Sequence, residues 1–431
     1  MTTQTRTLSK EMGVNDWIEY ENTRHGFQAR PDNPLATYTE FPETFRPGAP
    51  SYRLPLFEIS ETACLIFRST HPDPSLEEHY FPKGKVQFPV HPVNRDNESI
   101  PHIEEITSHP LQEIAVRPTS STRTVFIEDE TLAPHCLKPH TDLRITRWRR
   151  HMESRKIAHA IAVTKIFENC RVFKEYLKVG FFPESLGAVF GVSGAQKDWG
   201  FILREMQSQP HLEHSYKMIP LNALYTPSTK DRAADPLLVE MIVKSTKSPK
   251  DFLIEEIIQP LITGWIKIYL ETGVLLEPHG QNVIVEIDEK SGEIIRFSHR
   301  DFDCEINKDV LVENGYPLTH LNTRDLFTIE GDNWAPQGSH LSIIFDNSMQ
   351  VALEKLADIG AKYFALSEES IREECRAFLD REFSSFLSVH FSRNGKAYNF
   401  KKTQTGVSIV EKKHPPRWRS QQARDKATII A

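Results

Sequence analysis

Two runs of apolar and β-branched residues, about two thirds of the way along the chain, constrain its fold more than any other segment. The runs are Val283–Asp288 and Ile294–Phe297, and the short sequence Glu289–Gly292 separates them. Such a pattern predicts a β-hairpin with a tight turn. Because a hairpin brings its two ends together, residues before the first strand must lie beside residues after the second. The chain therefore contains an antiparallel sheet at this point.

Polar residues flank this hairpin on both sides. Glu277-Pro278-His279-Gly280-Gln281-Asn282 precedes it, and His299-Arg300-Asp301-Phe302-Asp303 follows it. Carboxylate and amide oxygens are the ligands that Mg²⁺ takes, often together with nucleotide phosphates, so Glu277, Asn282 and Asp301 are candidate metal ligands. His279 is a candidate donor to a phosphoryl or carboxylate oxygen. The alternative is a polar turn with a purely structural role.

A second polar segment lies about 160 residues earlier. Pro118-Thr119-Ser120-Ser121-Thr122-Arg123-Thr124 combines hydroxyl groups with an arginine, and Lys138 and the arginines at 144, 147, 149 and 150 follow. Hydroxyls and backbone N–H groups in a tight loop can hold phosphate oxygens. Arginine adds a bidentate fork and lysine a point charge, which suit a polyphosphate or a carboxylate. The alternative is an ordinary hydroxyl-rich turn beside a solvated helix start.

The composition excludes several classes of protein. The chain has 431 residues, a formal net charge of −7, 39% apolar and 26% charged residues. These values are typical of a globular protein and give no global reason to expect nucleic acid or an anionic membrane as a partner. The length predicts two to three lobes. Five widely spaced cysteines without a CxxC pair argue against a disulfide framework or a zinc site and favour a reducing compartment.

The N-terminus has no apolar signal region, and the most apolar stretch, Phe252–Leu270, contains several charged residues. We therefore expect a cytoplasmic protein. Hydrophobic periodicity predicts the remaining elements. Strands are expected at 63–67, 86–90, 113–116, 123–127, 137–145, 201–206 and 217–224. Helices are expected at 153–177, at 248–270 with a division near Pro260, and from Ser367 onward.

The last twenty residues contain six lysines and arginines and a Pro-Pro pair, and we expect a basic, solvated end. The chain has no GxxxxGK[ST] and no GxGxxG sequence. If it binds a nucleotide, it does so outside the Walker and Rossmann arrangements.

In order, these motifs resemble those of the siderophore synthetases that work independently of nonribosomal peptide synthetases, the aerobactin-synthetase-like family. Thr119–Thr124 is similar to the family's Thr-x-Ser-x-Arg-Thr loop, and Ile145–Arg150 to its Ile-Thr-Ser-x-x-Arg segment. Glu277–Asn282 followed by Arg300–Phe302 is similar to its Glu-x-His-x-Gln-Asn and Arg-Asp-Phe signature. The matches are collinear from about residue 22 to 305.

The resemblance implies a hand-like α+β fold with thumb, fingers and palm, in which the palm is an antiparallel sheet and the C-terminal part is helical. The corresponding division is a reduced thumb-like region at 1–110, a fingers-like region with the phosphate-binding loop at 111–240, a palm-like region with the helical part at 241–410, and the basic tail at 411–431.

The resemblance also implies an activity. Family members use ATP and Mg²⁺ to adenylate a carboxylic acid, commonly a polycarboxylic acid, and condense it with an amine or hydroxyl. The implied partners are small-molecule substrates and a second copy in a homodimer, with no nucleic acid and no membrane. The implied catalytic residues are His279, Arg123, Arg150 and Lys138. The implied nucleotide-binding residues are Thr119, Ser120, Ser121, Arg123, Thr124, Lys138, Gln281 and Asn282, and the implied metal ligands are Glu277, Asn282 and Asp301.

One departure from the family pattern concerns the carboxylate substrate. The family has a His-Pro-x-His-Pro-x-x-Lys segment where this chain has Asp16–Asn22, so the histidine and the lysine are missing. Arg24, His25 and His91 are candidate substitutes. Two other functions stay open on these residues: a relative that binds a nucleotide or metabolite without ligation, and a kinase-like phosphotransferase.

Overall fold

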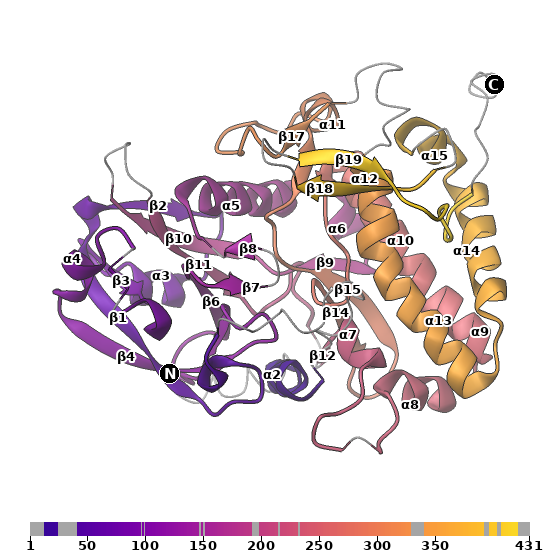
Figure 1. The fold of residues 1–431 in the computed structure, drawn as a ribbon, viewed down its shortest axis with the longest axis horizontal. Coiled ribbons are helices and arrows are strands. Elements are labelled where there is room, and N and C mark those ends of the chain that lie inside the picture. Colours follow the sequence, from indigo (N-terminus) through magenta and orange to yellow (C-terminus); the bar gives the residue numbers. More distant parts are fainter. Residues whose placement is uncertain are drawn as a thin grey trace.

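The structure is a computed structural model. It describes residues 13–24, 41–95, 97–98, 100–145, 148–149, 151–191, 198–213, 216–231, 233–328, 340–391, 396–402 and 407–420, with the side chains of 144–149 and 400–408 left aside. Figure 1 shows a lobe built around a large sheet, which contains the early part of the chain, beside a lobe rich in helices, which contains the late part. The expected α+β class is confirmed.

The larger sheet has eight strands, and every neighbouring pair is antiparallel. In spatial order they are β2 (Cys64–Arg68), β10 (Glu184–Phe190), β11 (Trp199–Glu205), β6 (His135–Pro139), β5 (Val125–Ile127), β4 (Leu111–Pro118), β1 (Tyr52–Ser60) and β3 (Lys85–Pro89). The short helices of this lobe are α3 (Pro74–Tyr80) and α4 (Ile103–Thr107). The sheet takes strands from both sides of residue 110, and the division of the chain into thumb, fingers and palm stays a prediction.

A longer helix, α5 (Ser154–Asn169), packs on this sheet at β10 and β11. Gly187 of β10 permits the close approach, because a Cβ atom there would lie 2.6 Å from the side chain of Ile157. The sequence predicts one helix over 153–177, but the structure has α5 and a separate α6 (Val172–Glu175). The carboxylate of Glu271 accepts hydrogen bonds from the backbone N–H groups of Arg171 and Val172. A cap from a distant segment thus starts the second helix.

The predicted hairpin is confirmed as β14 (Val283–Asp288) and β15 (Ile294–His299). It forms a four-stranded sheet with β12 (Tyr216–Pro220) and β9 (Val179–Phe181), of which β9 runs parallel to β15. The strand predicted at 217–224 is shorter, because the chain turns at Pro220 into α7 (Leu221–Tyr225). Proline cannot continue the donor pattern of a ladder but suits the start of a helix.

The helical lobe covers this smaller sheet. Its helices are α8 (Leu237–Lys244), α9 (Pro249–Asp251), α10 (Gln259–Thr272), α11 (Lys308–Glu313), α12 (His340–Ile344), α13 (Gln350–Phe364), α14 (Glu368–Glu382) and α15 (Ser384–His390). Its small sheets are β13 (Val274–Leu275) with β16 (Glu305–Asn307) and β17 (Leu326–Phe327), and the pair β18 (Tyr398–Lys402) and β19 (Val407–Glu411). One more short pair, β7 (Arg144–Ile145) and β8 (Trp148–Arg149), lies between β6 and α5 in the sequence.

The expected division near Pro260 is present as a change of helix type and not as a break in the helix. Residues Phe252–Ile258 form a π-helical segment that joins α9 to α10, so the chain stays helical through the proline. Proline lacks an N–H donor and its ring crowds the carbonyl four residues earlier. The wider π-helical turn just before it removes the need for that ordinary hydrogen bond.

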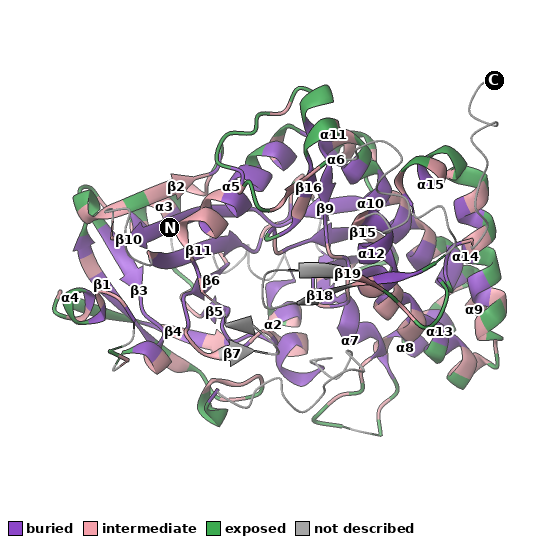
Figure 2. Cartoon of the chain, turned by 45° about the horizontal axis from the view of Figure 1, so that its top comes forward, coloured by how far each residue is buried: buried purple, intermediate pink, exposed green. Residues whose placement is uncertain are grey.

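Burial follows the two lobes, and Figure 2 shows buried strands and inner helix faces, with exposed residues on α11 and α15. A small apolar core joins the lobes and combines Phe126 and Cys136 of the large sheet with Met218 and Ile284 of the small one. Trp17 of the helix α2 (Val14–Thr23) completes it and is fully buried. Among the described helices, none is both long and apolar enough to cross a lipid bilayer.

The expected solvated C-terminal end is only partly correct for the described residues 411–420, because Lys413 and Arg417 are exposed but Trp418 and Arg419 are buried. Trp418 is fully buried, and its indole N–H donates to Glu354 Oε1 at 2.8 Å. Arg419 forms a buried two-point ion pair with Asp346. We call residues 407–420 the C-terminal strap. The basic residues hold it on the helical lobe because acidic partners are buried beneath it.

Candidate active site

The predicted phosphate-binding loop connects β4 to β5. Its backbone closes on itself, because Thr119 N donates to Thr124 O and Thr122 N donates to Thr119 O, each at 3.0 Å. Thr122 has φ of 62°, which is unusual for a β-branched residue and indicates local strain. The side chains of Thr119 and Ser121 are hydrogen-bonded to one another at 2.9 Å. The loop is thus a compact, largely buried structure with ordered N–H groups.

The second predicted segment is a turn at the start of the hairpin. Asn282 N donates to His279 O, and Gln281 N donates to His279 Nδ1 at 3.2 Å. Since Nδ1 accepts this bond, the ring proton lies on Nε2, which is 3.9 Å from Glu277 Oε2. A Cβ atom on Gly280 would lie 2.0 Å from the hydroxyl of Tyr225, so only glycine fits between this turn and α7.

Asp301, the second residue after the hairpin, also has a strained backbone. Arg300 N donates to Asn282 O at 3.0 Å, which places the two ends of the hairpin side by side as the sequence predicts. Asp301 follows with φ of 72°, in the left-handed region that favours glycine. Strained residues of this kind concentrate at functional sites, and here one lies in each of the two predicted motifs.

Direct contacts bring the two motifs together. Gln281 Nε2 donates to Ser120 Oγ at 3.2 Å, across 161 residues of sequence. Lys138 Nζ donates to Asp301 Oδ1, across 163 residues. Because one contact involves the loop itself and the other involves β6 beside it, the two predicted motifs meet at the junction of the two sheets.

Two buried residues that the sequence analysis did not single out as site residues complete the ion network. Glu184 begins β10, and its fully buried carboxylate lies next to Arg204 of β11 and 3.8 Å from Lys138 Nζ. Arg204 also lies 3.9 Å from Asp301. The strands β10, β11 and β6 are neighbours, so their side chains meet on one face. Arg204 lies in a Leu-Arg-Glu sequence, which could have marked it as a candidate site residue. Glu184 lies in no sequence motif that could have marked it.

The charges in this network set the protonation of Asp301. Desolvation raises its pKa, but Lys138 and Arg204 outweigh this effect and hold the pKa well below its usual range. The side chain of Asp301 stays 38% exposed, whereas that of Lys138 is 7% exposed. Asp301 is therefore an ionised carboxylate with one side toward solvent.

The donor set fits Mg²⁺ that arrives with phosphate groups. Within the described ranges, no three His, Cys, Asp or Glu side chains are grouped so as to hold a metal ion by themselves. Glu277 and Asp301 are both partly exposed, at 44% and 38% of the side chain, and Asn282 lies between them in sequence. Mg²⁺ commonly binds one or two carboxylates plus substrate phosphates, so this sparse set suits it.

Several predicted residues have other surroundings. Arg123 belongs to the loop itself, and its guanidinium lies 3.2 Å from the sulfur of Met152. Arg150 and Arg147 lie outside the described residues, as does His25. His91 is no substitute for the missing substrate-binding histidine, because it is fully buried with one ring nitrogen bonded to the Tyr52 hydroxyl and the other to Val93 N. Arg24 donates to Thr226 O.

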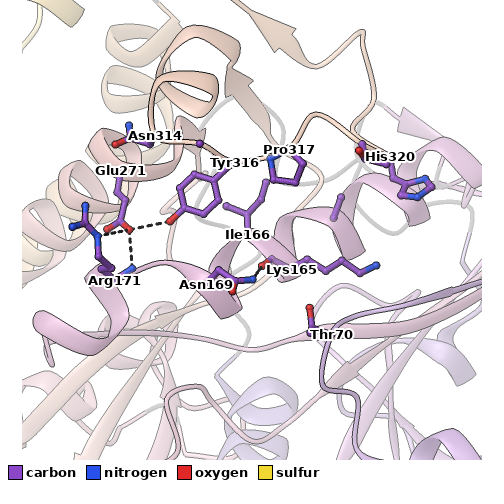
Figure 3. A pocket seen from close by; sticks show the side chains of 13 residues that line it. Thr70, Lys165, Ile166, Asn169, Arg171, Glu271, Asn314, Tyr316, Pro317 and His320 are labelled. Carbon is purple, nitrogen blue, oxygen red and sulfur yellow. Dashed lines mark hydrogen bonds and ion pairs between the residues drawn. The ribbon is translucent and has the colours of Figure 1, made fainter.

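A separate cavity of about 750 Å³ lies between α5, α10 and residues 314–320. Figure 3 shows Glu271 at its edge, directed toward Arg171 and Tyr316. The carboxylate accepts hydrogen bonds from two backbone N–H groups and from the Tyr316 hydroxyl at 2.9 Å. The role of this acid is therefore to cap α6, and the cavity shares no residue with the site described above.

Residues 58–226 match the family described as the IucA / IucC family. No curated protein matches the chain. Among solved structures, the petrobactin biosynthesis protein AsbB from Bacillus anthracis str. Sterne is similar with a TM-score of 0.69 at 19% identity, over 93% of this chain and 75% of that one.

Two further structures come from a hypervirulent pathotype of Klebsiella pneumoniae. ATP-bound aerobactin synthetase IucA has a TM-score of 0.65 at 14% identity, over 97% of this chain and 81% of that one. Aerobactin synthetase IucC has a TM-score of 0.61 at 15% identity, over 86% and 69%. These likenesses confirm the expected fold, a curled antiparallel sheet with a helical C-terminal region.

Proposed function

We propose that this chain, whose residues 58–226 match the IucA / IucC family, is an ATP- and Mg²⁺-dependent, AMP-forming ligase of siderophore-type biosynthesis. In the proposed reaction, an oxygen of a carboxylic acid, most simply a polycarboxylic acid, attacks the α-phosphorus of ATP and pyrophosphate leaves. An amine or hydroxyl then attacks the activated carbonyl and AMP leaves, which forms an amide or ester.

One observation carries the proposal: the hydroxyl-rich loop and the His279 turn, 160 residues apart, meet through Ser120 and Gln281. The hydroxyls of Thr119, Ser120, Ser121 and Thr124 are suited to phosphate oxygens, with Arg123 and Lys138 as the nearby cations. Gln281 and Asn282 form the opposite wall. That one of the similar structures is described as ATP-bound supports nucleotide binding here.

The chemistry needs charge stabilisation rather than a protein nucleophile. Negative charge grows on the α-phosphate as the carboxylate attacks, and preorganised cations stabilise it. Arg123 and Lys138 supply such cations, with Arg150 as a further candidate from the sequence. His279 offers a proton at Nε2, held in that tautomer by Gln281 N. Glu277, Asn282 and Asp301 are the proposed ligands of Mg²⁺, which would neutralise phosphate charge.

The residue roles predict strong effects of two substitutions. Arg123→Ala and His279→Ala should each lower turnover about 10²-fold to 10³-fold, the typical cost of one lost donor to a transition-state oxyanion. The assay measures pyrophosphate and AMP with a panel of di- and tricarboxylic acids, with hydroxylamine as the amine. Arg117→Ala and His109→Ala are matched controls, since both residues lie on the same lobe outside the loop and are partly or fully exposed.

The products distinguish the alternatives. A ligase releases pyrophosphate and AMP, a kinase-like enzyme releases ADP, and a relative that only binds nucleotide releases neither. Full activity in both Arg123→Ala and His279→Ala would contradict the site assignment. A homodimer, expected from the family resemblance, is part of the same proposal and is tested by the mass of the protein in solution.

A further inference from the structure

A buried carboxylate from the N-terminal helix lies at the centre of the site. Glu21 is in the last turn of α2, and its side chain is 0% exposed. Its Oε2 accepts a hydrogen bond from Ser120 N at 2.7 Å. Its Oε1 accepts from Arg300 Nη2 at 2.6 Å and from the indole N–H of Trp17 at 3.1 Å. One side chain thus contacts the phosphate-binding loop, the residue after the hairpin and its own helix.

Arg300 connects this carboxylate to the His279 turn. Its Nε donates to Gln281 O at 2.8 Å, and its guanidinium lies over the ring of Trp17 at 5.2 Å. Because Gln281 also donates to Ser120 Oγ, the contacts close into a ring: Glu21, Ser120, Gln281 and Arg300. A shift of any member moves the loop relative to the turn.

The charges of this ring are balanced internally. Burial raises the pKa of Glu21, but the Arg300 guanidinium and the hydrogen bonds from Ser120 and Trp17 outweigh burial and lower the pKa below its usual value. The carboxylate is therefore ionised at neutral pH. Arg300 has its charge opposed by Glu21 at close range, so α2 carries an anion in the segment where the family has a histidine and a lysine.

We propose that Glu21 is a positioning residue that holds the phosphate-binding loop and the His279 turn at their working separation, with Arg300 as its partner in this ring. The inference rests on the proposed function. Its physical basis is that placement of reacting groups is sensitive to small displacements, of which about 1 Å can cost about 10²-fold in rate.

Glu21→Gln tests the proposal because it keeps the volume of the side chain and removes its charge. The amide can accept from one neighbour, but its NH₂ then faces either Ser120 N or Arg300. We expect kcat for pyrophosphate release to fall about 10-fold to 100-fold, with KM for ATP changed less than about threefold.

Glu286→Gln is the matched control. Glu286 is also fully buried and ionically paired, with Arg296 Nε at 3.1 Å, but it belongs to the β14–β15 pair away from the loop. Both substitutions should lower the melting temperature, and only Glu21→Gln should lower kcat. If Glu21→Gln does not fold, Trp17→Phe is the alternative variant. It removes a single hydrogen bond to Glu21 and keeps an aromatic ring under Arg300. It should lower kcat about threefold to tenfold.

The outcomes separate the two proposals. If the wild-type protein releases no pyrophosphate with any carboxylic acid, the proposed function fails. If the wild type is active and a folded Glu21→Gln or Trp17→Phe variant keeps kcat within twofold, the positioning role is overturned. A rise in KM alone, with kcat unchanged, would also overturn it, because it would make Glu21 a contributor to uniform binding.

Discussion

At the scale of single residues, the large sheet holds a carboxyl group in an unusual state. Glu205 of β11 accepts a hydrogen bond from Asp73 N at 3.0 Å and is 7% exposed. The pKa of Glu205 is raised to about 7, mainly by burial and to a lesser degree by the nearby carboxylates of Asp73 and Glu168, against the hydrogen bonds from Ser185 and Asp73 N. The folded state thus binds this proton more tightly than the unfolded chain does.

The sign of the pH dependence follows from this difference. The contribution of Glu205 to stability is fully present below its unfolded pKa of about 4.5 and falls as the pH rises toward 7. Glu205→Gln should therefore gain stability relative to the wild type between pH 5 and pH 8, by up to about 3 kcal/mol at the upper end. Urea unfolding at the two pH values measures this.

Glu113→Gln, on the exposed face of β4, is the control and should not change the pH dependence. An equal loss of stability from pH 5 to pH 8 in the wild type and in Glu205→Gln would show that Glu205 is already ionised at pH 5.

At the scale of elements, the C-terminal strap depends on a pair of buried charges. Arg419 and Asp346 have side chains that are 3% and 0% exposed, with N–O distances of 3.1 and 2.8 Å. Burial raises the pKa of Asp346, and Arg419 opposes this. Removing one partner leaves the other charge buried without compensation.

Arg419→Ala should therefore destabilise the protein by about 3–5 kcal/mol, measured by urea unfolding. The loss should be larger at pH 8 than at pH 5, because Asp346 without Arg419 can be neutralised by a proton at the lower pH. Arg381→Ala, at an exposed ion pair of α14, should cost less than about 0.5 kcal/mol. A loss below about 1 kcal/mol in Arg419→Ala would mean that the strap does not depend on this pair.

Elements also show where local prediction fails. The helix predicted at 153–177 is divided by Glu271, a residue about 100 positions away that caps α6. The spacing of apolar residues over 153–177 is the same with or without that cap, so it could not predict the division. By contrast, the β14–β15 hairpin and the start of α14 at Ser367, whose side chain accepts from Ser370 N, depend on local residues and are confirmed.

At the scale of the whole molecule, the candidate site depends on both lobes. Loop 119–124 and Lys138 belong to the large sheet, whereas the His279 turn and Asp301 lie at the ends of strands of the small sheet. The apolar core around Trp17 and Met218 lies where the two sheets meet. A ligand held between these groups should stabilise the lobes against separation and unfolding.

Mg²⁺ with ATP should thus raise the melting temperature of the wild-type protein. At a nucleotide concentration 100 times Kd, the stabilisation is about 2.7 kcal/mol. The rise should be smaller with ATP and EDTA, because the proposed carboxylate ligands then face the phosphates without the metal. Arg123→Ala should reduce the rise and Arg117→Ala should preserve it. An unchanged melting temperature at millimolar Mg²⁺ and ATP would contradict nucleotide binding at this site.

The sequence by itself determined the hairpin at 283–297 and the residue types of two polar motifs, because these depend on local alternation and turn chemistry. The α+β class followed from the resemblance of those motifs to a known family. The sequence also led to the expectation that the ends of the hairpin meet, which the bond from Arg300 N to Asn282 O confirms. Only the tertiary structure decided that Glu21 joins these motifs, that Glu184 and Arg204 lie beside Lys138, and that Arg419 of the strap is buried. Those outcomes depend on pairs of opposite charges that lie 20 to 279 residues apart in the sequence. Periodicity along the chain does not indicate which distant charged residue will pair with a buried one.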